Sequence, residues 1–331
     1  MGSSTDRRVS MADVAAHAGV SGQTVSRVAN ASPRVDPATR ARVEEAMAVL
    51  GYRPHRAARA LRTGRTQTIG LVVSTLATVG NSRMLQAVAD AAGARGYALT
   101  VVTLGPEADI ENAFERLREH GVDGALVLNE ASAVARDAPA PARLELVVVD
   151  SPPDDRFGVI ATAHADGARN ATEHLLALGH SSVRHIAGPR GSFAADERER
   201  GWREALQHAG APVIEPFRGD WTAASGHHAG ALLAADASVT AVFAANDQMA
   251  LGVLRALFEG DRYVPGDVSV IGFDDVPDAA DFRPPLTTVR QDFDRLGERA
   301  VAMLVDRIEG HRLPLAESVS TALVIRGSTT G

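Results

Sequence analysis

The sequence contains no cysteine, which excludes a disulfide bond, a zinc-thiolate site and a catalytic thiol. No apolar run approaches the roughly 18 residues that a membrane-spanning helix needs, so we expect no membrane partner. Residues 1–19 also lack the apolar stretch of a signal peptide, and we therefore expect a cytoplasmic protein. Lysine is absent as well, since all 34 basic residues are arginine, but we attach no functional weight to this.

The signatures of common enzyme classes are missing too. The chain has no G-x-S-x-G nucleophile elbow, no P-loop and no G-x-G-x-x-G dinucleotide fingerprint. His227 and His228 are neighbours on an expected helix, where their side chains diverge by about 100° and do not bind one metal ion together. Asp274 and Asp275 follow an expected strand and point apart. We therefore expect no enzyme, no cofactor and no metal site.

The charge of the chain is unevenly distributed over its 331 residues, a length that suits two or three domains. Residues 1–65 carry 11 arginines against 5 acidic residues, whereas the rest of the chain carries 23 arginines against 36 acidic residues. A small basic segment on an acidic body suits an anionic partner such as DNA. Chance clustering of surface charge explains the same balance, so the residue pattern inside the basic segment has to decide.

Residues 10–30 predict two short helices in succession. Ser10 suits the N-cap of the first helix, Gly19 its left-handed end, and Ser21 the N-cap of the second. Apolar residues recur at helical spacing, and the small Ala15 lets the two helices cross closely. We interpret the pair as a helix-turn-helix, whose second helix enters the major groove of DNA. An ordinary helical hairpin with a solvated polar face accounts less well for these positions.

The outer face of the second helix carries the candidate DNA-binding residues. Gln23 and Arg27 lie one turn apart, and these residue types pair with adenine and guanine respectively. Thr24 and Ser26 are short donors that suit phosphate contacts, and Ser21 completes the set at the start of the helix.

A third helix and an arginine-rich segment follow. Asp36 suits the N-cap of a helix over residues 37–50, which Gly51 ends, so residues 1–54 form a complete small DNA-binding domain. Residues 55–66 have helical propensity, but they are too short to form a stable helix alone. A charged linker and a helix that orders when two copies pair on DNA are equally consistent with the residues themselves.

In the body, residues 67–331, apolar strand-like runs alternate with amphipathic helices. Such repeats predict parallel sheets with helices on both faces, and two series, the second starting near His164, predict two lobes. We therefore expect an all-α helix-turn-helix head on an α/β two-lobed body that is similar to periplasmic binding proteins. The first lobe is assigned to about 67–162 and 292–320, and the second to about 163–291 and 321–329.

Polar side chains at the carboxyl ends of the expected strands are candidate ligand-binding residues, because ligands of open parallel sheets bind there. Carboxylate, amide and guanidinium groups bind the hydroxyls of sugars, and an aromatic ring packs on a C–H face. The candidates are Ser74, Asn129, Asp150, Arg198, Trp221, Asn246 and Asp274.

Each candidate has a structural alternative. An Asn or Asp after a strand often only caps a helix, Trp221 suits a core, and Arg198 suits a surface ion pair. Their joint occurrence at strand ends favours binding. For Asp275 we prefer the helix cap and leave it out of the site.

Six segments of the chain are similar to the lactose/galactose repressor family of bacterial regulators. They are MADVAAHAGVSGQTVSRVAN, TRARVEEAMAVLGYRPHRAARALRTGRTQTIG, GDWTAASG, ANDQMALGVLRAL, VIGFDD and PPLTTVRQDFDRLG, and the similarity extends from Val9 to about Thr329. GDWTAASG, ANDQMALG and PPLTTVRQDF resemble lactose-responsive members more than purine- or ribose-responsive ones. The resemblance implies a repressor that leaves double-stranded operator DNA when a sugar binds.

The resemblance also implies roles for individual residues. Residues 56–62 match a hinge helix, with Leu61 as a wedge in the minor groove and Arg56 and Arg59 beside it near the phosphates. Positions that bind galactoside in the family are matched by Asp150, Arg198, Trp221, Asn246 and Asp274, and further pocket positions by Ser74, Asn129, Gln291 and Phe293.

Some positions depart from the family pattern. Thr162 replaces a phenylalanine, and residues 78–81 replace an apolar pocket wall, so we expect a galactoside-like sugar without naming it. Gly22 replaces a base-reading tyrosine, so we expect a different operator sequence. The sequence ends at Gly331 without a leucine-heptad tail, which suggests a homodimer. Two alternatives are a purine-type repressor whose ligand strengthens DNA binding, and a sugar-binding protein without a DNA function.

Overall fold

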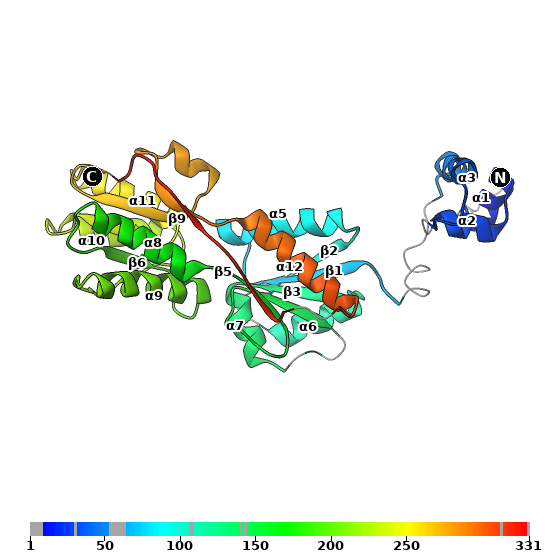
Figure 1. Cartoon of the computed structure of the whole chain (residues 1–331), viewed down its shortest axis with the longest axis horizontal. Helices are drawn as coiled ribbons and strands as arrows, with labels where there is room; N and C mark the ends of the chain where they lie inside the picture. Colours follow the sequence, from blue (N-terminus) through cyan, green and yellow to red (C-terminus); the bar gives the residue numbers. More distant parts are fainter. Residues whose placement is uncertain are drawn as a thin grey trace, which may run out of the picture. The chain divides into compact units, whose positions relative to one another are not determined.

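The computed structural model of the chain describes residues 9–29, 32–52, 64–105, 109–139, 141, 144–311 and 314–329. Residue contacts divide the chain into two compact units, Met1–Thr66, here called the head, and Gln67–Gly331, the body (Figure 1). The predicted DNA contacts of Arg56, Arg59 and Leu61 lie outside the described residues. Within the described ranges, no helix combines the length and apolar character that crossing a bilayer requires.

In the residues that the structure describes, the head contains three helices whose ends are set by capping residues. They are α1 (Met11–Ala18), α2 (Gly22–Ala29) and α3 (Pro37–Leu50). The amide of Asp13 donates to Ser10 Oγ at 3.3 Å, and the amide of Ser10 donates to the Asp13 carboxylate at 2.8 Å, which completes a capping box. Gly19 ends α1 at a φ of 63°, and Ser21 Oγ accepts the amide of Thr24 at 3.1 Å as α2 begins.

The three helices of the head share one small core. Val14, Val25 and Val43 are fully buried, one from each helix, and Ala15 lies between them in the same cluster. The small Ala15 of α1 is buried in this core together with Val25 and Val28 of α2. The helix-turn-helix is therefore confirmed.

The first lobe of the body is a six-stranded sheet covered by helices on both faces. In space its strands follow the order β11-β5-β4-β3-β1-β2, and all neighbours pair in parallel. Their bounds are β1 (Thr68–Val73), β2 (Ala98–Thr103), β3 (Gly124–Leu128), β4 (Glu145–Val149), β5 (Gly158–Thr162) and β11 (Ala316–Val319). The helices are α5 (Val79–Ala94), α6 (Ile110–Glu119), α7 (Glu130–Asp137) and α12 (Phe293–Ile308). One core cluster joins α5 and α12 to the sheet, and another joins α6 and α7 to it.

The second lobe repeats this plan with a different edge. Its strand order is β12-β10-β9-β8-β6-β7, with β6 (Arg184–Ala187), β7 (Phe217–Arg218), β8 (Ala241–Ala244), β9 (Ser269–Asp274), β10 (Thr287–Arg290) and β12 (Ala322–Val324). Its helices are α8 (His164–Ala177), α9 (Phe193–His208), α10 (Ala223–Ala234), α11 (Asp247–Glu259) and the short 3₁₀ helix η1 (Pro277–Asp281). The expected α/β lobes with parallel sheets are confirmed, except that β12 pairs antiparallel with β10 at the edge.

The chain passes between the lobes at three short connections, from β5 to α8, from β10 to α12 and from β11 to β12 (Figure 1). Asp150 comes directly after β4 of the first lobe, and Asp274 is the last residue of β9 in the second. Both residues line the same pocket, so strand ends of the two sheets meet where the lobes meet.

The packing of α8 against α9 yields a stability prediction. A Cβ atom added at Gly201 on α9 would lie 2.0 Å from the carbonyl oxygen of Ala165 on α8. Gly201→Ala should therefore lower the free energy of unfolding by about 3 kcal/mol, because two backbones must separate. Chemical denaturation monitored by circular dichroism measures the change.

The matched control for this prediction is Gly93→Ala on α5, where an added Cβ meets nothing within 4 Å. Alanine in place of glycine in an open helical position should raise the free energy of unfolding by about 0.5–1 kcal/mol. Equal effects of the two substitutions would contradict the proposed close packing at Gly201.

Candidate functional site

The outer face of α2 in the head is the first candidate site. Gln23 and Arg27 are exposed and one turn apart, on the side opposite the buried Val25 and Val28. Thr24 and Ser26 are half-buried on the same helix, and the exposed Ser21 serves as its N-cap. All the predicted residues of α2 therefore lie on or beside a face that a partner can reach.

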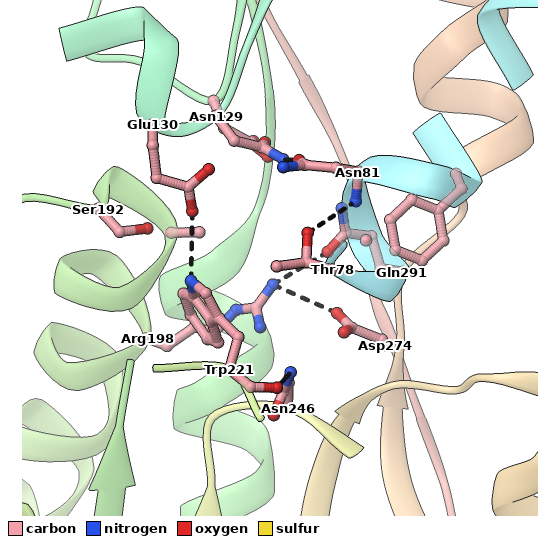
Figure 2. A pocket seen from close by; sticks show the side chains of 14 residues that line it. Thr78, Asn81, Asn129, Glu130, Ser192, Arg198, Trp221, Asn246, Asp274 and Gln291 are labelled. Carbon is pink, nitrogen blue, oxygen red and sulfur yellow. Dashed lines mark hydrogen bonds and ion pairs between the residues drawn. The ribbon is translucent and has the colours of Figure 1, made fainter. Parts of the chain in front are cut away.

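The second candidate site is a pocket between the two lobes of the body (Figure 2). Its empty volume is about 450 Å³, a figure that includes space open to solvent. It is lined by Thr78, Gly80, Asn81, Asn129, Glu130, Asp150, Ser192, Ala194, Arg198, Trp221, Asn246, Asp274, Gln291 and Phe293.

Eight of the nine predicted ligand-binding residues line this pocket, and Ser74 does not. Ser74 follows β1, but the N-terminal turn of α5 provides the lining on that side through Thr78, Gly80 and Asn81. Ser74 is not among the lining residues of this pocket, and its role in ligand binding stays a prediction.

Arg198 lies at the centre of the pocket and is buried rather than in a surface ion pair. Its Nη2 donates to Asp274 Oδ1 at 3.4 Å and to Gln291 Oε1 at 3.1 Å, and its Nη1 donates to the carbonyl of Ala245. The guanidinium carbon is 3.7 Å from the ring centroid of Phe273 and 5.5 Å from that of Trp221. This network and the two rings compensate for the removal of the charge from water.

Asp274 shares the buried environment of Arg198. Burial raises the pKa of Asp274 to about 6, the nearby charge of Arg198 opposes this rise, and the charge of Asp150 adds to it. Beneath it, Asp247 is buried and accepts bonds from Thr288 Oγ1 at 2.6 Å and from a backbone amide. Burial and the charge of Asp274 raise the pKa of Asp247 well above its usual value.

On the first-lobe side, Asp150 contacts His164, a residue that the sequence analysis did not select. His164 Nε2 lies 3.0 Å from Asp150 Oδ1, which also accepts the amide of Thr162 at 2.9 Å. Burial lowers the pKa of His164 and the carboxylate of Asp150 opposes this shift, while Arg198 Nε donates to His164 Nδ1 at 3.3 Å. Burial alone would raise the pKa of Asp150, but His164 and the Thr162 amide hold it below its usual value.

The helix-cap alternative holds for one asparagine of the site and fails for another. Asn246 caps α11, since its Oδ1 accepts the amide of Met249 at 2.9 Å, while its Nδ2 donates to the carbonyl of Trp221 at 3.1 Å. Asn129 makes no cap bond to α7, and its Nδ2 instead donates to Asn81 Oδ1.

The preferred interpretation of Asp275 as a helix cap is wrong. Its carboxylate forms ion pairs with Arg290 at 2.7 Å and with Arg326 at 2.6 Å. The η1 helix begins after Val276, and that cap position has no side-chain bond. Asp275 therefore forms ion pairs with two arginines that are distant in the sequence, and it does not cap the helix that follows it.

Four residues of the pocket hold the backbone in a conformation that L-amino acids rarely adopt. Asn129, Asp150, Trp221 and Asp274 have φ values of 49°, 54°, 71° and 113°. Each such position typically costs about 1–3 kcal/mol and persists only where the surrounding structure enforces it. Their concentration around one cavity favours binding over a purely structural role.

Glu130, Ser192 and His164 are parts of the site that the sequence reasoning missed. Glu130 directly follows Asn129, so the same rule about strand ends could have included it. Its Oε1 accepts a bond from Trp221 Nε1 at 3.2 Å, which joins the first lobe to the second across the pocket (Figure 2).

The lining suits hydrogen bonding to a polyhydroxyl ligand better than metal binding. Asp150 and Asp274 are both within bonding distance of cationic or imidazole groups, which occupy part of their coordination capacity. Elsewhere in the described parts of the chain, Asp306, Glu309 and His311 have ligand atoms within 4.8 Å of one another. They lie near the end of α12, where His311 and Asp306 already form an ion pair at 3.2 Å.

Comparisons with known proteins match both units. The model for bacterial regulatory proteins of the lacI family matches residues 10–55, and a periplasmic binding protein-like domain matches residues 172–329. The lactose operon repressor of Escherichia coli (strain K12) is 37% identical over 328 residues, covering 97% of this chain and 91% of that protein.

Two solved structures are also similar. The lac repressor dimer bound to operator and the anti-inducer ONPF gives a TM-score of 0.85 at 34% identity, covering 98% of this chain and 100% of that one. A complex of the transcriptional regulator CelR with cellobiose gives a TM-score of 0.71 at 34% identity, covering 97% and 100%.

The raised pKa of Asp274 predicts a pH dependence of stability. Because the folded state binds this proton more tightly than the unfolded state, wild-type stability falls as pH rises from about 4 through 6. Asp274→Asn removes the titration, so the stability of wild type relative to the variant should fall by about 3 kcal/mol between pH 4 and 7. Urea denaturation of both proteins across this range measures the difference.

Asn246→Ala is the control for this titration, because it removes a neutral side chain from the same pocket. The effect of Asn246→Ala on the free energy of unfolding should not change with pH in the way expected for Asp274→Asn. A difference between wild type and Asp274→Asn that stays constant with pH would show that Asp274 is not protonated near pH 6.

Proposed function

The chain belongs to the lacI family of bacterial regulatory proteins, and we propose that it is a dimeric repressor that a galactoside-like sugar releases from its operator. Family membership confirms the resemblance and establishes the coarser statement: the chain is an effector-responsive transcriptional repressor. It also confirms that the chain is not an enzyme, since this family consists of regulators.

The observation that carries the effector proposal is the composition of the interlobe pocket. One cavity holds the Arg198 guanidinium, the carboxylates of Asp150 and Asp274, the amide of Asn246 and the indole ring of Trp221. Sugars present hydroxyls in many directions and an apolar C–H face, and this set supplies a partner for each. Two of the similar proteins named above have a sugar in their descriptions: the lactose operon repressor and the CelR–cellobiose complex. These descriptions support the proposal that the effector is a carbohydrate.

The choice of a galactoside rests on the residues that match galactoside-binding positions. They are Asp150, Arg198, Trp221, Asn246 and Asp274, all of which line the pocket. The altered wall at residues 78–81 contributes Thr78, Gly80 and Asn81, which are small or polar. This wall suits a hydrophilic group next to the sugar better than an apolar aglycone.

The proposed switch depends on a pocket that both lobes build. A ligand there changes the balance between lobe arrangements only by the difference in its affinity for them. Release therefore requires the sugar to bind the DNA-free arrangement more tightly than the operator-bound one. Residues 55–66 are proposed to transmit the change as paired hinge helices, with Leu61 in the minor groove and Arg56 and Arg59 near phosphates.

DNA recognition is proposed for α2 of the head, in keeping with the operator complex of the similar lac repressor dimer. Gln23 and Arg27 are exposed on it and are proposed to contact bases, while Thr24 and Ser26 contact phosphates and Ser21 orients the helix start. Two heads of a dimer would then occupy the two halves of a palindromic operator.

Operator release is the direct test. Fluorescence anisotropy of labelled DNA from upstream of the gene follows binding, and a panel of galactosides, cellobiose, ribose and purines is then titrated. We expect specific binding that a galactoside reverses. Release by cellobiose alone would identify cellobiose, and not a galactoside, as the effector. Tighter operator binding in the presence of a purine would contradict the proposed release by a ligand.

Paired variants separate the two functions. Arg27→Ala should weaken specific operator binding by roughly 10- to 100-fold through the loss of a base contact, with sugar affinity unchanged. Arg198→Met should abolish release while operator affinity is retained, because its side chain lies in the pocket of the other unit. Sugar binding by titration calorimetry and dimer mass by sedimentation provide the remaining readouts.

A further inference from the structure

Glu130 forms no ion pair with an arginine or histidine of the described chain, whereas Asp150 lies beside His164 and Asp274 beside Arg198 in the same pocket. It is the first residue of α7, directly after the strained Asn129 at the end of β3. Its Oε1 accepts the indole N–H of Trp221 at 3.2 Å, so the carboxylate is held at a fixed place in the pocket wall (Figure 2).

The second oxygen of Glu130 is buried without a partner. No hydrogen bond reaches Oε2 from any of the residues that the structure describes. Trp221 has only one N–H, and Oε1 already uses it. A buried carboxylate oxygen without a donor is energetically unfavourable. A ligand hydroxyl that donates to Oε2 therefore gains more binding free energy than a hydroxyl that donates to an acceptor already in contact with solvent.

Trp221 holds Glu130 in place because the indole ring is itself confined. A Cβ atom added at Gly188 would lie 2.3 Å from the ring, and the Arg198 guanidinium carbon lies 5.5 Å from its centroid. The backbone carbonyl of Trp221 also accepts from Asn246 Nδ2 at 3.1 Å. Glu130 is therefore oriented by a residue that has little freedom to move.

The charge of the pocket points to the class of ligand. Among the described residues of the lining, Glu130, Asp150 and Asp274 supply three carboxylates and Arg198 is the one arginine. Its guanidinium already donates to Asp274, Gln291, a backbone carbonyl and His164. A phosphate or carboxylate on the ligand would meet several negative charges and few available donors, in surroundings where such repulsion is poorly screened.

We propose that Glu130 determines effector specificity: its Oε2 accepts a hydrogen bond from a hydroxyl of an uncharged sugar, and the carboxylate helps to reject phosphorylated sugars. The inference rests on the proposed function, since it refines the ligand class of the same pocket. Glu130 thus acts in two ways, as an acceptor for the correct ligand and as a like charge against the wrong one.

Glu130→Gln tests the acceptor role with little change in shape. The amide oxygen still accepts from Trp221, so the contact between the lobes remains, while an NH₂ group replaces Oε2. Titration calorimetry at pH 7.5 compares lactose and cellobiose with their 6-phosphates. For the uncharged sugar that binds, we expect the phosphate to bind wild type at least about 100-fold more weakly.

In the variant, the uncharged sugar should bind roughly 10- to 100-fold more weakly, as expected when a hydrogen bond to a charged acceptor is lost. The discrimination against the 6-phosphate should shrink by about tenfold at the same time. If Glu130 only held the lobes together, its substitution would weaken the binding of both ligands equally and leave the ratio of their affinities unchanged. Glu119→Gln, an exposed substitution on α6, is the matched control and should behave as wild type.

The outcomes are distinguishable. Unchanged sugar affinity in Glu130→Gln, or a constant ratio, would overturn the role of Glu130 while leaving the proposed function intact. Equal binding of sugar and sugar phosphate by wild type would overturn the charge argument, and this measurement needs no variant. If neither lactose nor cellobiose bound wild type, the proposed effector class would fail, and the inference with it.

Discussion

The burial of one guanidinium charge is the constraint on which the arrangement of the body depends. Arg198 is 4% exposed, and an unpaired cation there would cost several kcal/mol. Its compensation comes from the carboxylate of Asp274 at the end of β9, the carbonyl of Ala245 after β8 and the ring of Phe273. These groups tie α9 to the carboxyl ends of two neighbouring strands and so hold one wall of the pocket in place. A pocket built around an obligatory charge is preorganised for a polar ligand.

The backbone around this charge is held away from its preferred conformations. Asn129, Asp150, Trp221 and Asp274 all have positive φ, and each lies after or at the end of a strand or in a loop beside the cavity. In these conformations the side chains point toward the pocket, whereas in a regular strand they would point to one face of the sheet or the other. Strain of this kind is stable only because the sheets and helices behind it are well packed. The large buried cores on both faces of each sheet supply that support.

Local rules predicted most of this chain, and long-range contacts account for the failures. Caps at Ser10 and Asp36, and the stop at Gly19, could be located because they depend on residues within one helical turn. The rule about strand ends found Asp150, Asn246 and Asp274 for the same reason. The preference for a helix cap at Asp275 was wrong, because its partners Arg290 and Arg326 are 15 and 51 residues away. His164 was missed because its importance comes from Asp150 and Arg198, which only the folded chain brings near, whereas Glu130 follows Asn129 and the rule about strand ends could have included it.

The same long-range contacts give the pocket a means of coupling the lobes. Asp150 belongs to the first lobe, and its carboxylate lies 3.0 Å from His164, which in turn accepts from Arg198 in the second. Glu130 and Trp221 make a second link between the lobes. A ligand that inserts among these groups must exchange protein contacts between the lobes for contacts with itself. Its binding energy is therefore tied to the distance between the lobes, which is the requirement for a ligand to favour one arrangement over another.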